Sequence, residues 1–436
     1  MQTKSNFVPI IFLGILFFIF GFVTWLNGTL IQYLKIACEL NTFQSLLVAF
    51  AFYISYFVMA LPSSWILEKT GFKKGMMLGL FVMAIGALVF IPAAYSRTYE
   101  LFLVGLFIIG TGLSILQTAS NPYITIVGPI ESAAARISVM GICNKVAGVL
   151  APIILGAIVL SDADALVNEL KQLDEAQKNI RLDELASRVI FPYSIMAIVL
   201  LVLGLMIRFS PLPEVDSPSP TLPEGKGEKN DSVSSPSGRL GGATNVFQFP
   251  NLVLGVIALF LYVGVEVMAG DTIGSYGRSL DIPLSETKNF TAFTLTAMVI
   301  GYIIGIIAIP KFISQAKALA ISAVIGILFS AAVVFTHGYY SVRFIALLGL
   351  ANALMWPAIW PLAIHGLGKF TKTGSALLIM AIAGGATLPL IYGKLTDVES
   401  IGHQQAYWMM VPCYLFILYY SVKGFKILNW KRKKMV

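Results

Sequence analysis

Amide side chains inside long apolar segments are the groups of this sequence best suited to chemistry. Asn27 lies in the first of these segments, Gln117 and Asn121 lie in the fourth, and Asn144 lies in the fifth. A polar group in an apolar setting is costly unless it is paired or lines a cavity. The four amides therefore predict a binding site for a polar, uncharged ligand. The structural alternatives are hydrogen bonds between helices for Asn27 and Gln117, and for Asn121 a bond to a backbone carbonyl freed by Pro122.

Three ionisable side chains lie in the same apolar setting: Lys145 beside Asn144, Glu266 near the centre of the seventh segment, and Asp271 toward its end. A buried lysine must pair, reach the surface or give up its charge. We therefore hypothesise that Glu266 serves ion coupling or ligand binding and pairs with Lys145 in one conformational state. Glu266 would either titrate with H⁺ or ligate Na⁺ together with Asp271. The alternative is a static ion pair that only holds two parts of the protein together.

Two indoles complete the set of candidate binding residues. Trp356 and Trp360 lie one helical turn apart in the tenth apolar segment and share a face. Amides bond the hydroxyls of a sugar, and aromatic rings cover the apolar C–H face of its ring, so the combination predicts a sugar site. A lipid or drug site would need fewer amides, and an anionic metabolite would need paired arginines inside the segments. Helix packing is the alternative role for the two indoles.

The sequence predicts neither an enzyme nor a metal centre. Its three cysteines have no metal-ligand or disulfide spacing, and its three histidines are scattered. No nucleophile–base pair and no phosphate-binding loop is visible. We expect no catalytic residue, no metal and no resident cofactor, with H⁺ or Na⁺ as a co-transported ion.

The elements that must position these residues are membrane-spanning helices. The chain of 436 residues is 57% hydrophobic and only 12% charged, about half the charge of a soluble domain. Its apolar residues form unbroken blocks of about 20, the length of a spanning helix. They do not alternate as in a β-barrel. The blocks lie near 7–34, 43–67, 75–95, 100–127, 134–160, 188–209, 250–276, 289–313, 317–336, 340–366, 373–396 and 405–426. The fold class is therefore all-α, a polytopic membrane protein with twelve transmembrane helices.

The blocks form two pseudo-symmetric six-helix bundles, 1–209 and 249–436, joined by a polar linker, 210–248, that is too rich in Pro, Ser, Gly and charge to fold. Glycine and proline repeat between the halves at a single offset: Gly148, Pro152 and Gly156 correspond to Gly385, Pro389 and Gly393. Two related halves around a central site is the plan of transporters that work by alternating access.

Basic residues indicate the orientation. The net charge of +8 comes from Lys and Arg in short loops. That pattern is typical of cytoplasmic loops rather than of nucleic-acid binding. If both termini are cytoplasmic, these loops share one side, and residues 161–187 form a charged surface helix on the other. The first block is too long for a signal peptide. We expect a monomer in the lipid bilayer of a bacterial inner membrane.

The stretches FVTWLNGTLIQYLK, FQSLLVAFAFYISYF and ILQTASNPYITIVGPIE resemble the fucose–galactose–glucose–proton symporter family of the major facilitator superfamily. The stretch VGVEVMAGDTI is similar to its glucose/galactose permease branch. The resemblance covers nearly all spans and implies import of a hexose, with glucose or galactose first and a fucose-like sugar next. It also implies sugar-binding roles for Asn27 and Asn144, which match family positions.

The loop between the second and third spans resembles the signature of the superfamily. Glu68, Gly71, Lys73 and Lys74 keep its acidic, glycine and basic positions. The resemblance implies that these residues form a cytoplasmic charge network that controls conformational gating.

Two departures from the family affect coupling. The protonatable Asp and Glu of the fucose symporters correspond here to Gly28 and Gln117, neither of which can take a proton. That coupling route is absent, which makes a facilitative uniporter an alternative to a symporter. An exporter of small amphipathic compounds would share the topology and is a further alternative.

Overall fold

The computed structural model describes residues 7–126, 133–210, 245–309, 312–367, 370–427 and 430, and within these ranges the secondary structure is helical, without strands. The first group of helices is α1 (Phe7–Trp25), α2 (Asn27–Ala37), α3 (Thr42–Ser96), α4 (Tyr99–Ile126), α5 (Ala133–Val159), α6 (Ala163–Leu170), α7 (Glu175–Ser187) and α8 (Ile190–Phe209). The second group is α9 (Pro250–Asp271), α10 (Ile273–Ser279), α11 (Leu284–Thr287), α12 (Phe290–Ala308), α13 (Gln315–Phe335), α14 (Tyr339–Asn352), α15 (Met355–Ile364), α16 (Thr371–Met380), α17 (Gly384–Thr396), α18 (Gly402–Gln405) and α19 (Met410–Val422). Short 3₁₀ turns are η3 (Val246–Gln248), η5 (Ala381–Ala383), η6 (Ala406–Met409) and η7 (Gly424–Lys426).

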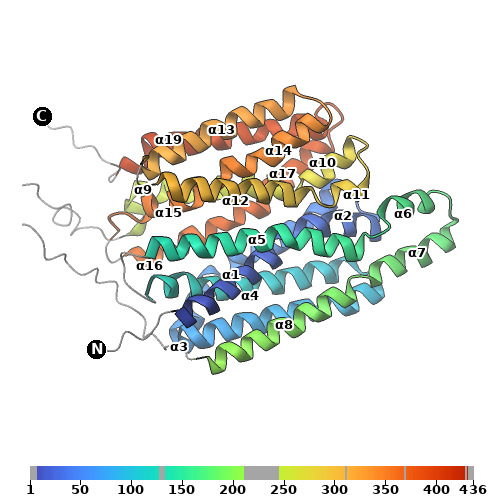
Figure 1. Ribbon diagram of the computed structural model, residues 1–436, viewed down its shortest axis with the longest axis horizontal. Coiled ribbons are helices and arrows are strands. Elements are labelled where there is room, and N and C mark those ends of the chain that lie inside the picture. The colour runs from blue at the N-terminus through green and yellow to red at the C-terminus, as the bar shows by residue number, and fades with distance from the viewer. Residues whose placement is uncertain are drawn as a thin grey trace, which may run out of the picture.

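The helices run nearly parallel along the long axis of the molecule (Figure 1). Among the described residues, ten helical segments are long and apolar enough to cross a membrane. This number is smaller than the twelve expected blocks for two reasons. The second and third blocks merge into the single 55-residue α3. The twelfth, which comprises η6 and α19, is not among the ten segments.

The expected loop between the second and third blocks is a single backbone break inside α3. Gly71 has φ 75° and ψ 173°, whereas its neighbours on both sides are helical. This region of backbone conformation is open almost only to glycine. The glycine of the loop signature therefore lets one continuous chain of helix reverse its direction across the membrane.

Several spanning segments contain or end at a break in the helix. The first is divided at Leu26, the seventh at Thr272, and the eleventh at η5. The tenth is divided between α14 and α15 because Pro357 has no N–H with which to continue the ladder. Interrupted helices at mid-membrane leave backbone and polar groups free near a binding site.

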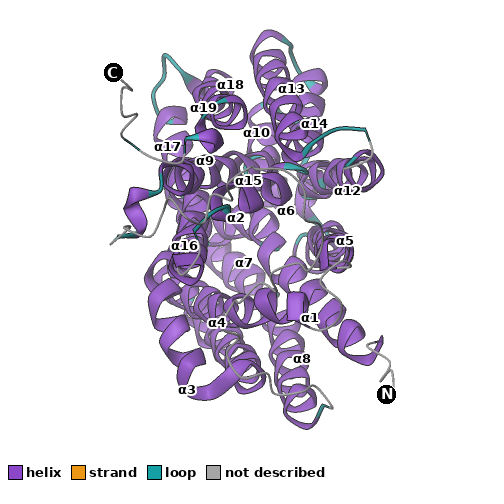
Figure 2. Ribbon diagram, turned by 90° about the vertical axis from the view of Figure 1, so that its left-hand side faces the viewer, coloured by secondary structure: helices purple, strands orange, loops and turns teal. Residues whose placement is uncertain are grey.

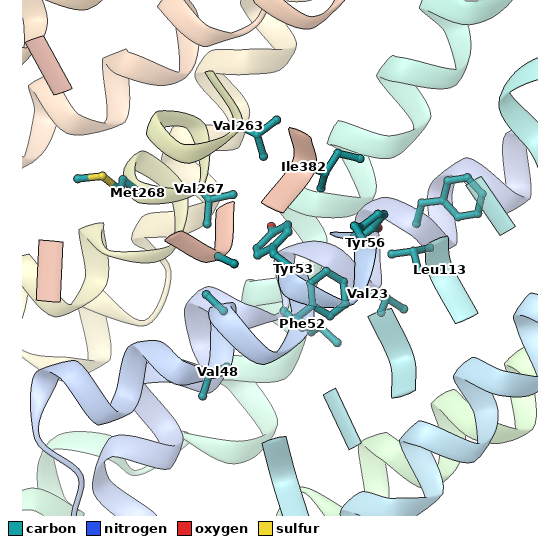
Figure 3. Close-up of a cluster of buried hydrophobic side chains, with 14 of the residues drawn as sticks. Val23, Val48, Phe52, Tyr53, Tyr56, Leu113, Val263, Val267, Met268 and Ile382 are labelled. Atoms are coloured by element: carbon teal, nitrogen blue, oxygen red, sulfur yellow. The ribbon is translucent and has the colours of Figure 1, made fainter. Parts of the chain in front are cut away.

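The two helix groups meet along their lengths, as Figures 1 and 2 show. Helix α5 packs against α12, and α3 packs against α17. These pairs include the repeated Gly-Pro-Gly positions of α5 and α17. A buried cluster at the meeting plane joins Phe52, Tyr53 and Tyr56 of α3 to Val267 of α9 and Ile382 of η5 (Figure 3).

The expected surface helix over 161–187 is wrong in detail, because the segment forms two helices, α6 and α7. The chain turns between them, and the Asp174 side chain begins α7 by accepting a hydrogen bond from the Gln177 amide. Arg188, which follows α7, forms an ion pair with Asp162, which precedes α6. This ion pair holds the two short helices together at their junction with the bundle. Helices α6, α7, α10 and α11 all lie at one end of the molecule, named here the hairpin end (Figure 1). The expected linker lies mostly outside the described residues, which omit 211–244.

Candidate functional site

An ion pair between the two helix groups occupies the centre of the candidate site. Lys145 Nζ on α5 donates to Glu266 Oε1 on α9 over 2.9 Å. The two residues are 7% and 8% exposed. The hypothesised pairing of these residues is therefore observed, and it links two helices that are far apart in the sequence. Each charge is compensated by the other, so the pair adds no net charge to the interior.

Trp25 completes the environment of Lys145. The ammonium nitrogen lies 4.6 Å from the centroid of the indole ring, within the range of a cation–π interaction. The ring fits because glycines lie on both sides of it: a Cβ on Gly148 of α5 or on Gly270 of α9 would lie within 2.6 Å of the ring. The last residue of α1 thus contacts both helices of the ion pair.

The two predicted tryptophans form an aromatic stack on α15 that contacts the helix of Glu266 through Tyr262. The rings of Trp356 and Trp360 on α15 have centroids 5.4 Å apart and planes 26° apart. Trp356 also contacts Tyr262, with centroids 6.5 Å apart. Because Tyr262 precedes Glu266 by four residues, it lies on the same face of α9. Both indoles keep part of their surface exposed.

Two of the predicted amides, Gln117 and Asn144, form hydrogen bonds to neighbouring helices. Gln117 Nε2 on α4 donates to the Tyr56 hydroxyl over 3.1 Å. Asn144 Nδ2 donates to the Phe17 carbonyl of α1 over 3.4 Å, so in this structure it faces α1 rather than the second helix group. Asn121 is half-buried on α4, one turn beyond Gln117.

Asn27 and Asp271 are buried and have no hydrogen-bond partner among the residues that the structure describes. Asn27 begins α2, is 0% exposed, and has neither amide atom paired. Asp271 ends α9, is 0% exposed, and has neither carboxylate oxygen paired. Asp271 is not part of the Lys145–Glu266 pair. Buried polar groups are almost always hydrogen-bonded, so these two side chains are candidates for contact with a ligand, an ion or an ordered water.

The signature residues of α3 lie at the end of the molecule opposite the hairpin end. Lys73 Nζ donates to the Ser210 carbonyl at the end of α8 over 2.7 Å. Glu68 and Lys74 are exposed and make no ion pair within the described part of the chain. With Gly71 as the backbone break, the signature here joins α3 to α8, and its gating role stays a prediction.

At the hairpin end the two groups are joined by direct hydrogen bonds. Gln32 Nε2 donates to the Thr287 carbonyl over 3.2 Å, and the Thr287 hydroxyl donates to Gln32 Oε1 over 3.1 Å. Asp164 of α6 accepts from the amides of Leu284 and Ser285 over 2.6 and 3.2 Å. This set of contacts, which joins the two helix groups at the hairpin end, is named here the outer latch.

Sequence reasoning missed the aromatic residues that surround the polar ones. Trp25, Tyr53, Tyr56 and Tyr262 were read as part of apolar blocks, because an aromatic residue in such a block has the same pattern whether it packs or binds. The one sequence feature that indicated a place in the site for any of these aromatic residues was the nearness of Trp25 to Asn27. No group of three or more metal-ligating side chains is found in the residues that the structure describes.

Comparison with known proteins gives the relationships of the chain. Residues 13–390 match the profile of the Major Facilitator Superfamily. The chain is 36% identical over 418 residues to a glucose/galactose transporter of Brucella abortus biovar 1 (strain 9-941), covering 95% of this chain and 93% of that one. It is 30% identical over 403 residues to the L-fucose-proton symporter of Escherichia coli (strain K12), covering 92% and 89%.

The architecture is similar to solved structures. The crystal structure of the transporter FucP in the outward conformation matches with a TM-score of 0.72 and 27% identity, over 96% of this chain and 99% of that one. A D-xylose-proton symporter matches with a TM-score of 0.64 at 14% identity, which is a likeness of fold alone.

Proposed function

The chain belongs to the Major Facilitator Superfamily, and from this premise we propose that it imports a hexose, glucose or galactose first, by alternating access. It is a multi-pass membrane transporter and not an enzyme. Its family and its named relatives are likewise transporters. The sugar assignment is supported by relatives named for glucose, galactose and fucose. It is also supported by the composition of the site between the helix groups.

The observation that carries the proposal is a polar interior whose charge is internally neutral. Lys145 and Glu266 compensate each other over 2.9 Å, and the other candidate sugar-binding residues are amides and aromatic rings. A sugar hydroxyl can donate to Glu266 and accept from Lys145, and charged groups make the stronger hydrogen bonds. The Trp356–Trp360 stack offers a flat apolar face for the sugar ring. An anionic ligand would lack a free cation here.

The orientation follows from the basic loops. With both termini cytoplasmic, the hairpin end faces outward across a bacterial inner membrane, and the outer latch closes the site from outside. We propose that the molecule works as a monomer in the bilayer. The latch parts when the halves rock, and a sugar then enters from the hairpin end.

Coupling to H⁺ or Na⁺ is the third part of the proposal, with Glu266, Lys145 and Asp271 as the residues involved. An inward charge movement gains about 2.3 kcal/mol per 100 mV of membrane potential, enough to concentrate a sugar tens of times. A facilitative uniporter would exchange sugar but would not accumulate it, so ion gradients separate the two.

Binding of tritiated D-glucose and D-galactose to the purified protein tests the site. We expect Trp360→Ala to weaken binding roughly threefold to tenfold, because an aromatic contact contributes about 0.5–1.5 kcal/mol. Trp408→Ala is the matched control: Trp408 is 39% exposed and contacts Phe335 at the hairpin end. Equal affinity in the wild type and the Trp360 variant would contradict the aromatic contact, and a wild type that binds no hexose would contradict the sugar assignment.

A further inference from the structure

We propose that a small oxyanion of the phosphate type binds in a pocket at the hairpin end, between the two helix groups, and holds that end closed. The pocket is separate from the Lys145–Glu266 site and takes a different class of ligand. Anion binding and closure do not depend on which substrate the protein carries. Only the resulting control of transport rests on the proposed alternating access.

The pocket has a volume of about 490 Å³ and is lined by both helix groups. Helices α2, α6 and α7 contribute from the first group, and α10, α11 and α18 contribute from the second. Figure 1 shows most of these helices gathered at the hairpin end. A buried water needs about 10–15 Å³ of such space. The pocket, named here the outer pocket, therefore has room for an oxyanion and several waters.

The charge of the outer pocket favours an anion. Its lining includes three cations, Lys35, Lys178 and Arg278, and one carboxylate, Glu39. Glu39 forms an ion pair with Lys178. Lys35 and Arg278 therefore remain without an ion-pair partner in the described part of the chain. Two uncompensated cations that line one pocket attract a ligand of negative charge.

Both of these cations keep hydrogen-bond donors for a ligand. Lys35 Nζ donates to the Thr42 hydroxyl over 3.0 Å, which leaves two of its three N–H groups. Arg278 donates from one terminal nitrogen to the Ile282 carbonyl over 3.0 Å, which leaves most of its five. A guanidinium group can bind an oxyanion through two parallel hydrogen bonds, and these are among the stronger hydrogen bonds in proteins.

Two further carboxylates lie near these cations without pairing with them. Asp164 lies near Arg278, but its oxygens accept from the amides of Leu284 and Ser285. Asp397 lies near Lys35, is exposed, and forms no ion pair in the described part of the chain. Neither carboxylate lines the outer pocket. The place of a contacting anion is therefore left to a ligand.

Unpaired polar groups in the lining point to the same ligand. Ser275 precedes Arg278 by three residues, so the two share a face of α10. Ser275 is 6% exposed, and its hydroxyl has no hydrogen-bond partner in the described part of the chain. Nδ1 of His403 on α18 is also buried and unpaired there. A bound oxyanion would accept from the hydroxyl, which otherwise leaves a buried donor unsatisfied.

The position of the two cations connects binding to closure. Lys35 belongs to the first helix group and Arg278 to the second, and Gln32 of the outer latch lines the same pocket. One anion can contact both cations only while the groups are together at this end. A ligand that binds one of two states shifts the population toward that state. The oxyanion therefore stabilises the closed hairpin end and slows the entry of substrate there.

Equilibrium dialysis of radiolabelled inorganic phosphate against the purified protein, in chloride buffer of constant ionic strength, tests the binding site. We expect one saturable phosphate per chain. Arg278→Gln and Ser275→Ala should each weaken binding roughly tenfold, as the loss of a hydrogen bond to a charged group does. Ser275→Ala removes a hydroxyl that bonds nothing in this structure, so folding should not be affected. Arg343→Gln is the matched control, since Arg343 is exposed on α14 and lies over the Tyr340 ring.

A wild type that binds no phosphate, or equal affinities in the Arg278 and Arg343 variants, would overturn the assignment of the pocket. Closure is measured by electron-spin distances between labels at Gln172→Cys and Tyr340→Cys, one exposed site on each helix group, in a background without the three native cysteines. Phosphate, but not chloride, should enrich the short distance, and Arg278→Gln should remove this effect. Binding without such a shift contradicts the closure. Neither measurement uses a hexose, so a failure of the sugar assignment would leave both results unchanged.

Discussion

Lys145 and Glu266 are each the reason that the other can stay charged inside the membrane. Both are more than nine-tenths buried, and the indole of Trp25 covers the ammonium group at 4.6 Å. In such a pair the loss of one partner is far more costly than the loss of both, since a lone buried charge is left behind.

We therefore expect Lys145→Met to lower stability by about 3–5 kcal/mol and the double variant Lys145→Met/Glu266→Leu to recover most of that loss. Thermal unfolding in detergent measures the difference. Neither variant should bind hexose, because the single variant lacks the ammonium group of Lys145 and the double variant lacks both charged hydrogen-bonding groups. A single variant as stable as the wild type, or a double variant less stable than the single one, would contradict this role of the pair.

The pairing of these two residues could be predicted from sequence because each charge stands alone in an apolar block and needs a partner. The position of Trp25 over the pair could not be predicted. It depends on Gly148 and Gly270, which lie on different helices and make room for the ring only after the halves have packed. The engagement of Asn144 with the Phe17 carbonyl was likewise hidden, because an amide has the same pattern whether it faces a ligand or a neighbouring helix.

At the scale of elements, the interruptions in the helices are what place the site. Asn27 begins α2, Asp271 ends α9, and Trp356 follows the break between α14 and α15. The lengths and order of the apolar blocks could be read from sequence, since hydropathy alone determines them. The internal breaks were not predicted, because a break of one or two residues does not interrupt an apolar run. The split of residues 161–187 into α6 and α7 was missed for the same reason, because the break between these two helices is also short.

We propose that the short helix α6 helps to close the hairpin end, a role that its amino-acid composition does not indicate. Its Asp164 accepts hydrogen bonds from two backbone amides of the other helix group. We expect Asp164→Ala to open the hairpin end more often, by roughly tenfold or more, because hydrogen bonds to a charged group contribute about 1.5–3 kcal/mol. The rate of alkylation of Ser275→Cys from outside, in a Cys38→Ser background, measures this opening.

Asp183→Ala is the control for that measurement. Asp183 lies on α7 and pairs with Arg97 inside the first helix group, so it does not bridge the groups. Its loss should leave the alkylation rate unchanged. Equal rates in the two variants would mean that the Asp164 contact does not hold the latch closed.

At the scale of the whole molecule, two groups of helices meet around one neutral polar centre. They are joined at the hairpin end by the outer latch and at the centre by the ion pair. The fold class followed from the sequence because twelve apolar blocks and a repeated glycine–proline pattern leave few other arrangements. The conformational state could not be predicted from the sequence. The same sequence must be stable in both the open and the closed state, and only contacts between the halves distinguish these states.

The most direct test of the account is counterflow in proteoliposomes loaded with unlabelled hexose and exposed to radiolabelled D-glucose or D-galactose. The account predicts transient uptake of label that unlabelled hexose suppresses and that protein-free liposomes do not show. If no hexose exchanges, or if only amphipathic compounds do, the sugar transport proposed for this chain is contradicted.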